Sequence, residues 1–90
     1  MNYVVELEPR AVEDLSTLPP GVQRAILEAM RLIGANPTRG TRPAHPPYPA
    51  GMLYRTEFPF QGATCLVDIV FRYGPDEQTL YIGRVFVDYA

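Results

Sequence analysis

Residues 11–37, AVEDLSTLPPGVQRAILEAMRLIGANP, decide the first half of the fold, because they contain two helical patterns separated by a proline pair. Pro9 precedes them, and its fixed φ angle suits the first turn of a helix. After Pro19–Pro20, apolar residues recur at helical spacing until Gly34, which is typical of a second helix and its end. The stretch therefore predicts a helix hairpin.

Strand patterns flank the hairpin on both sides. Tyr3–Leu7 is rich in residues that favour strands. Three further strands are predicted at Met52–Phe58, Ala63–Tyr73 and Gln78–Tyr89, separated by PFQG and GPDE, which are typical of tight turns. We expect an α+β fold with an N-terminal strand, a helix hairpin and then a three-stranded antiparallel meander. The helices should pack on one face of a twisted sheet.

The composition indicates one small globular domain, residues 1–90. Hydrophobic residues make up 47% of the chain and charged residues 20%, and no apolar run is long enough to span a bilayer. No signal segment is apparent, and the single Cys65 has no partner for an internal disulfide. We expect a cytoplasmic protein without membrane association. A net charge of -2 excludes nucleic-acid binding by charge over the whole surface.

A proline-rich stretch, TRGTRPAHPPYP (residues 38–49), connects the hairpin to the meander. It has no periodicity, so we expect an irregular surface loop. Arg39, Arg42 and His45 should be exposed there, where they could form a weak patch that contacts phosphates of a nucleic acid.

Alternation predicts which side chains of the meander face the helices. In the middle strand the odd positions are uniformly apolar and should face inward; they are Cys65, Val67, Ile69, Phe71 and Tyr73. The last strand is apolar on both sides. We place Tyr81, Gly83, Val85 and Val87 inward, and Leu80, Ile82, Arg84, Phe86 and Asp88 outward.

The outward face then combines charged and apolar residues. Its charged members are Arg55, Glu57, Asp68, Arg72, Arg84 and Asp88, and its apolar members are Leu53, Leu66, Val70, Leu80, Ile82 and Phe86. The charges balance, which is consistent with cross-strand ion pairs on a solvated sheet. An open apolar row on a small protein, however, usually marks a binding site.

The same face holds the candidates for catalysis. A metal-free phosphodiesterase could use Glu57 as general base, Arg55 and Arg84 on the phosphate, and Tyr89 or His45 as acid. Alternatively, Arg55 is an anchor that pairs with an acid on the sheet or on a partner. One Cys and one His cannot supply a structural zinc site, and no phosphate-cradling glycine loop is present. We therefore expect no metal and no cofactor.

The order of elements resembles that of the RelE/ParE superfamily of toxins from type II toxin–antitoxin modules. The resemblance covers nearly the whole chain. It is carried by Ala11, Asp14–Leu15, Leu18–Pro19, the helix around Ile26, Asn36–Pro37, Tyr54–Arg55 and the LYIGRVF stretch near the end of the chain. It implies that the first strand pairs beside the last, with the outward face forming the functional surface.

The resemblance also implies a function. Such toxins either cleave mRNA on the ribosome without a metal or poison DNA gyrase, and a cognate antitoxin neutralises them within a toxin–antitoxin hetero-oligomer. We expect the antitoxin to contact the outward face at Leu53, Val70, Arg72, Ile82 and Phe86. A catalytically inactive relative that acts as an interaction or autoregulatory module is the alternative.

The chain departs from the nucleases of this superfamily at particular positions. Glu57 stands where they have a second basic residue, and Thr64–Cys65 stand where they have a Tyr-Arg or Trp-Arg pair. Val87–Asp88 stand where the nucleases have a His or Lys. Tyr89 could take the place of their terminal tyrosine, although we expect the chain end to fray. Ribosome-dependent mRNA cleavage and gyrase poisoning therefore both stay open.

Overall fold

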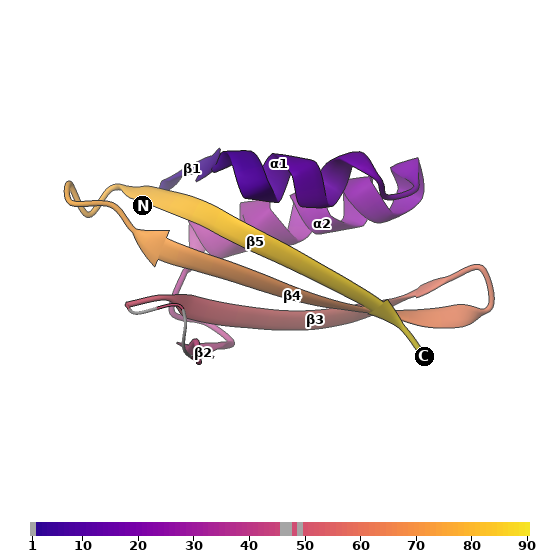
Figure 1. Ribbon diagram of the computed structural model, residues 1–90. Helices are drawn as coiled ribbons and strands as arrows, with labels where there is room; N and C mark the ends of the chain where they lie inside the picture. Colours follow the sequence, from indigo (N-terminus) through magenta and orange to yellow (C-terminus); the bar gives the residue numbers. More distant parts are fainter. Residues whose placement is uncertain (1, 46–47, 49) are drawn as a thin grey trace.

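Two helices cover one face of a five-stranded sheet (Figure 1). The computed structural model describes residues 2–45, 48 and 50–90. Its elements are β1 (Val4–Leu7), α1 (Pro9–Ser16), α2 (Pro20–Ala35), β2 (Thr41–Pro43), β3 (Met52–Phe60), β4 (Ala63–Tyr73) and β5 (Thr79–Tyr89). The sheet order is β1-β5-β4-β3-β2, with β1 parallel to β5 and the other pairs antiparallel. The predicted α+β fold is confirmed.

Both helices begin as the prolines predict, since α1 starts at Pro9 and α2 at Pro20. Near the end of α2, the Gly34 carbonyl accepts a hydrogen bond of 2.8 Å from the backbone N–H of Tyr3. A Cβ atom on Gly34 would lie 2.8 Å from Val5 Cγ2, which is too close for ordinary contact. The absence of a side chain on Gly34 therefore lets Tyr3 and β1 lie against α2. No helix in the described ranges is long and apolar enough to cross a membrane.

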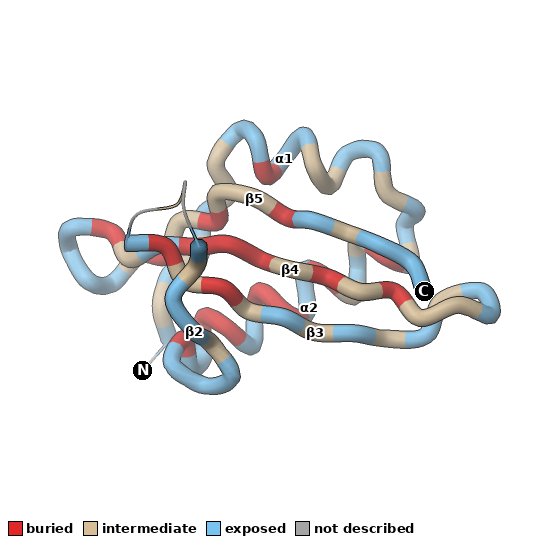
Figure 2. Tube along the Cα trace, turned by 60° about the horizontal axis from the view of Figure 1, so that its bottom comes forward, coloured by how far each residue is buried: buried red, intermediate tan, exposed pale blue. Residues whose placement is uncertain are grey.

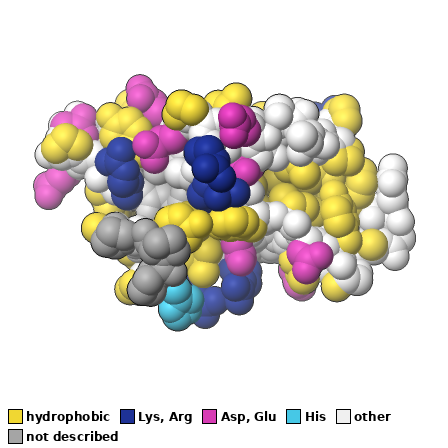
Figure 3. All heavy atoms as spheres, in the orientation of Figure 1, with side chains coloured by type: hydrophobic (Ala, Val, Ile, Leu, Met, Phe, Trp, Pro, Cys, Tyr) yellow, Lys and Arg dark blue, Asp and Glu magenta, His cyan; other side chains and the backbone are white. Residues whose placement is uncertain are grey.

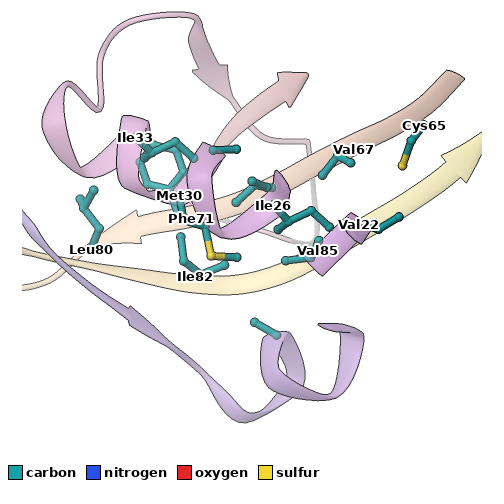
Figure 4. Close-up of a cluster of buried hydrophobic side chains, with 13 residues drawn as sticks. Val22, Ile26, Met30, Ile33, Cys65, Val67, Phe71, Leu80, Ile82 and Val85 are labelled. Atoms are coloured by element: carbon teal, nitrogen blue, oxygen red, sulfur yellow. The ribbon is translucent and has the colours of Figure 1, made fainter. Parts of the chain in front are cut away.

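The core lies between the helices and the inward face of the sheet. Ile26, Met30 and Ile33 of α2 point toward the strands, where they meet Phe71 and Ile82 (Figure 4). The odd positions of β4 from Cys65 to Phe71 are all buried, as the alternation predicts, and Tyr73 packs against the same cluster. This apolar layer is what the helical period of α2 and the alternation of β4 jointly require.

Along β5, the residues that face the core are even-numbered at first and odd-numbered after a bulge. Val70 pairs with Arg84, whereas the next residue, Phe71, pairs with Ile82, so Gly83 is an extra residue in a β-bulge. Before the bulge, Leu80 and Ile82 belong to the core and are fully buried.

This bulge overturns part of the predicted alternation. Leu80 and Ile82 do not face outward, and Tyr81 does not face inward, because a bulge shifts the alternation by one residue. Beyond the bulge, Val85 and Val87 pack against the core as predicted.

The stretch after α2 was predicted to be irregular, and this is wrong for Thr41–Pro43. These residues form β2, a short antiparallel edge strand in which Thr41 pairs with Tyr54. Pro43 has no N–H to donate, which an edge strand tolerates. Arg39 and Arg42 are exposed, as expected. Pro46, Pro47 and Pro49 of the predicted loop lie outside the described residues.

One carboxylate joins α1 to β5 directly after the bulge. Asp14 Oδ2 accepts hydrogen bonds of 2.8 Å from both Arg84 Nε and the backbone N–H of Val85, and Asp14 Oδ1 accepts one of 3.2 Å from the Arg84 guanidinium. Burial alone would raise the pKa of Asp14. The hydrogen bonds from Arg84 and Val85, together with the Arg84 charge, outweigh it and lower that pKa.

The bulge makes a prediction about stability. Ile82→Ala should lower the free energy of unfolding by roughly 2 to 5 kcal/mol, because it leaves a cavity in the core. Phe86→Ala, four residues later on the exposed side of β5, should cost about 1 kcal/mol or less. Urea unfolding followed by circular dichroism measures both. Equal losses of unfolding free energy would contradict the assignment of Ile82 to the core and Phe86 to the opposite face.

The Asp14 link makes a prediction about pH. Because its pKa is lowered on folding, the stabilisation is fully present above the unfolded value of about 3.9 and is lost as pH falls through the folded value. Asp14→Asn should therefore cost about 1 to 3 kcal/mol at pH 7, and the difference from the parent should shrink below about pH 4. Denaturant unfolding at several pH values tests this, with the exposed Glu13→Gln as the matched control. A loss that does not depend on pH would mean that the charge of Asp14 does not matter.

Candidate functional site

The face of the sheet opposite the helices is the candidate site, and we call it the outer face. Strand register and the inward core place the following side chains of β3, β4 and β5 on it, among others: Leu53, Arg55, Glu57, Leu66, Asp68, Val70, Arg72, Tyr81, Arg84, Phe86 and Asp88. The predicted Arg55, Glu57 and Arg84 thus share one face. Ile82 does not, so its predicted contact with an antitoxin is wrong.

Arg55 is held by a carboxylate on the neighbouring strand. Asp68 lies directly opposite it in register, and its two oxygens accept hydrogen bonds of 2.7 Å from Arg55 Nε and 3.1 Å from the terminal nitrogen Nη2. These bonds to Asp68 raise the pKa of the Arg55 guanidinium above its usual value. The prediction that Arg55 pairs with an acid on the sheet is confirmed.

The other two arginines of the outer face also meet carboxylates. Arg84 is bound to Asp14 of α1, and its side chain is only 26% exposed. The Arg72 guanidinium lies 3.4 Å from Glu8 and stacks on the Tyr81 ring, 4.6 Å from its centroid. Figure 3 shows arginine and acidic side chains next to one another on the surface. The expected cross-strand pairing is therefore present only for Arg55 and Asp68. Arg72 and Arg84 pair instead with Glu8 and Asp14, which lie outside the meander.

The candidate general acids are not assembled with these arginines. Tyr89 lies opposite Cys65 in register, so its side chain belongs to the side of the sheet that faces the helices. The chain end is not frayed, because the backbone groups of Ala90 and Thr64 exchange two hydrogen bonds of 2.9 Å. His45 is exposed after β2, outside the strands that carry these arginines.

The apolar row on the outer face is largely covered rather than open. Leu53 and Val70 are only 8% and 6% exposed. Tyr48 lies against Phe86 edge to face, with ring centroids 6.5 Å apart, and the Arg84 guanidinium stacks on the Phe86 ring 4.7 Å from its centroid. Phe86 alone keeps substantial exposure, 39%. Sequence reasoning missed Tyr48, because no periodic pattern surrounds it.

Two of the depressions on this face are lined mainly by β4 and β5. One, of about 270 Å³, lies at its far end and is lined by Arg55, Leu66, Asp68, Phe86, Val87 and Asp88. The other, of about 230 Å³, lies beneath Tyr48 and includes Glu8, Arg72, Tyr81 and Gly83 in its lining. In the described part of the chain no cluster of His, Cys, Asp and Glu could hold a metal ion.

This arrangement suits binding better than phosphate chemistry. A phosphate at Arg55 or Arg84 would have to compete with a carboxylate already hydrogen-bonded to each guanidinium. Glu57 and Asp88 add further negative charge to the same face. Their Coulomb repulsion of a phosphate opposes the attraction that the arginines exert on it. Transition-state stabilisation needs donors that are free when charge develops.

Comparison with known proteins supports the fold. No family model matches the chain, and no curated protein matches it. The toxin–antitoxin complex RelBE2 from Mycobacterium tuberculosis gives a TM-score of 0.75 at 24% identity, covering 100% of both chains. A variant of E. coli toxin RelE in the free state gives 0.65 at 13% identity, covering 94% of this chain and 82% of that one. The archaeal RelE–RelB complex from Pyrococcus horikoshii OT3 gives 0.58 at 14% identity, covering 94% and 93%. This chain has the fold of the RelE toxins.

Proposed function

We propose that this protein is the toxin component of a type II toxin–antitoxin module and is neutralised by a cognate antitoxin in a hetero-oligomer. Two observations support the proposal. Between 94% and 100% of the chain matches structures described as toxins or toxin–antitoxin complexes, and its outer face keeps an apolar and charged groove beside Phe86. Such a protein would act in the cytoplasm.

We further propose that its toxicity does not depend on mRNA cleavage. The observation that carries this is the pairing of Arg55 with Asp68 and of Arg84 with Asp14, in which Nε and Nη2 of each guanidinium already bind a carboxylate that a phosphate would have to compete with. Glu57 adds negative charge beside Arg55, where a nuclease of this superfamily would have a basic residue. Inhibition of DNA gyrase is therefore the favoured activity, with an inactive interaction module as the alternative.

We place the antitoxin over the groove of about 270 Å³ at the far end of the outer face. Phe86 is the exposed aromatic side chain there, and exposed aromatic side chains commonly anchor interfaces. Leu53 and Val70, predicted contacts, are too buried to provide much surface. Arg72, also predicted, is exposed but lies on the side of the Tyr48 depression.

The proposed function makes a prediction about activity. Purified protein added to translating ribosomes should leave mRNA intact by primer extension, because the arginines of the outer face are neutralised. The same protein should inhibit supercoiling by gyrase. Clear ribosome-dependent cleavage by the parent would overturn the non-nuclease proposal, and its loss in both Arg55→Ala and Glu57→Gln would assign the cleavage to these residues. Neither activity, with no growth arrest on expression, would point to an inactive module.

The proposed function also makes a prediction about the antitoxin. Phe86→Asp should weaken antitoxin binding at least about tenfold, because it places a charge in the anchor position. Leu27→Asp is the matched control, since Leu27 is similarly exposed at 49% but lies on α2. Calorimetric titration of antitoxin into each variant measures the effect. Unchanged affinity for the Phe86 variant would show that the antitoxin binds elsewhere.

A further inference from the structure

The outer edge of β3 carries backbone groups whose direction follows from hydrogen bonds elsewhere in the sheet. Thr64 exchanges two backbone hydrogen bonds with Ala90, so the backbone polar groups of the even residues at this end of β4 point to β5, and those of the odd residues point to β3. Their partners on β3 are Thr56, Phe58 and Phe60. The backbone N–H and C=O groups of the intervening residues, Arg55 and Glu57, must therefore point away from β4.

β2 satisfies only the beginning of this edge. It pairs with Met52–Tyr54 and goes no further, because Gly40 has a φ of +72° and turns the chain away. In Figure 2, β2 accompanies the first part of β3 only. From Arg55 to Pro59 no other strand pairs with this edge within the described residues.

Pro59 marks where the open edge ends. It has no N–H, and its position is one that points outward, so it costs no hydrogen bond to β4. The open edge therefore offers two adjacent outward positions, Arg55 and Glu57, each with a donor and an acceptor. A short extended segment needs this pattern to add as a strand.

The surroundings of the open edge are cationic and partly apolar at the end next to β2. One depression of about 310 Å³ is lined by Gly40, Thr41, Arg42, Leu53 and Arg55. Another of about 440 Å³ includes Leu32, Ala35, Arg39 and Tyr54. Among the ion pairs of the described residues, none involves Arg39 or Arg42. These two arginines are therefore available to a carboxylate.

We propose that the open edge of β3 from Arg55 to Pro59 binds an extended acidic segment of a partner protein, which adds to the sheet as a strand in line with β2. The partner's acidic side chains lie at the end near Arg39 and Arg42, and an apolar side chain enters the depression beside Leu32 and Tyr54. This inference rests on the open edge, the two neighbouring depressions, Arg39 and Arg42, and does not depend on the proposed function.

A second copy of this chain fits the edge less well. Antiparallel pairing of two β3 strands centred on Thr56 would set Arg55 opposite Glu57, which is favourable. The β2 strand of the second copy, which lies beside its Met52–Tyr54, would then occupy the space next to Phe58–Phe60. A nucleic acid fits less well too, because its backbone cannot satisfy N–H and C=O groups at strand spacing.

The test uses amide exchange read residue by residue by NMR. The probe is a synthetic six-residue peptide with blocked ends that has glutamate at positions 1 and 3 and valine elsewhere, and the control is the same peptide with lysine for glutamate. The free protein should exchange the amides of Arg55 and Glu57 rapidly and those of Thr56 and Phe58 slowly. Saturating acidic peptide should slow exchange at Arg55 and Glu57 at least about tenfold, with no change at Thr56 and Phe58.

Matched variants separate the backbone from the side chain. Glu57→Pro removes an outward N–H and should abolish the protection at Arg55, whereas Glu57→Ala keeps the N–H and should retain it. Arg39→Ala with Arg42→Ala should weaken binding of the acidic peptide about tenfold. If Glu57→Pro does not fold, the exchange pattern of the parent still decides the outcome.

Three results would overturn the proposal. The first is slow exchange at Arg55 and Glu57 in the free monomer. The second is protection that depends on protein concentration without peptide, which would assign the edge to a second copy. The third is equal protection by the lysine peptide or by a single-stranded RNA oligonucleotide, since neither carries the carboxylates that the arginines should select.

Discussion

The carboxylate of Asp14 is the contact on which the arrangement of β5 depends. It accepts hydrogen bonds from Arg84 and from the backbone of Val85, the two residues that follow the bulge at Gly83. The same group thus ties α1 to the sheet and fixes where the strand resumes its alternation. Leu80 and Ile82 enter the core before the bulge and Val85 after it, so both halves of β5 can bury apolar side chains.

That contact also limits the chemistry of the outer face. Arg84 cannot serve both as the partner of Asp14 and as a free phosphate ligand, and Asp68 restricts Arg55 in the same way. A RelE-type fold therefore carries here a surface whose cations are largely satisfied internally. Removing one partner of the less exposed pair, Arg84–Asp14, would leave an uncompensated charge, so this pair fixes the position of Arg84 on the sheet.

The sequence predicted the layers of this fold because α2 and β4 each have one uniform apolar side. The prediction failed at β5, because both its even and its odd positions are apolar. Only the bulge at Gly83 determines that Leu80 and Ile82 before it, and Val85 and Val87 after it, face the core. The Arg55 pair was predictable from residues on facing strands. Asp14–Arg84 was not, because the partners lie 70 residues apart on a helix and a strand. Tyr48 was missed because its contact with Phe86 follows no periodicity.

Arg55 and Glu57 share a face of β3 but differ in their pairing, because Arg55 is bound to Asp68 whereas none of the ion pairs of the described residues involves Glu57. Asp68 satisfies Arg55, so the side chains at this point of β3 leave a net negative charge on Glu57, while Arg39 and Arg42 leave positive charge at the β2 end. The open backbone edge runs between these two poles. A segment that pairs with it would meet a charge gradient along its length, and only one strand direction can place its acidic end beside the arginines. Electrostatics would thus select the orientation that the backbone hydrogen bonds alone leave open.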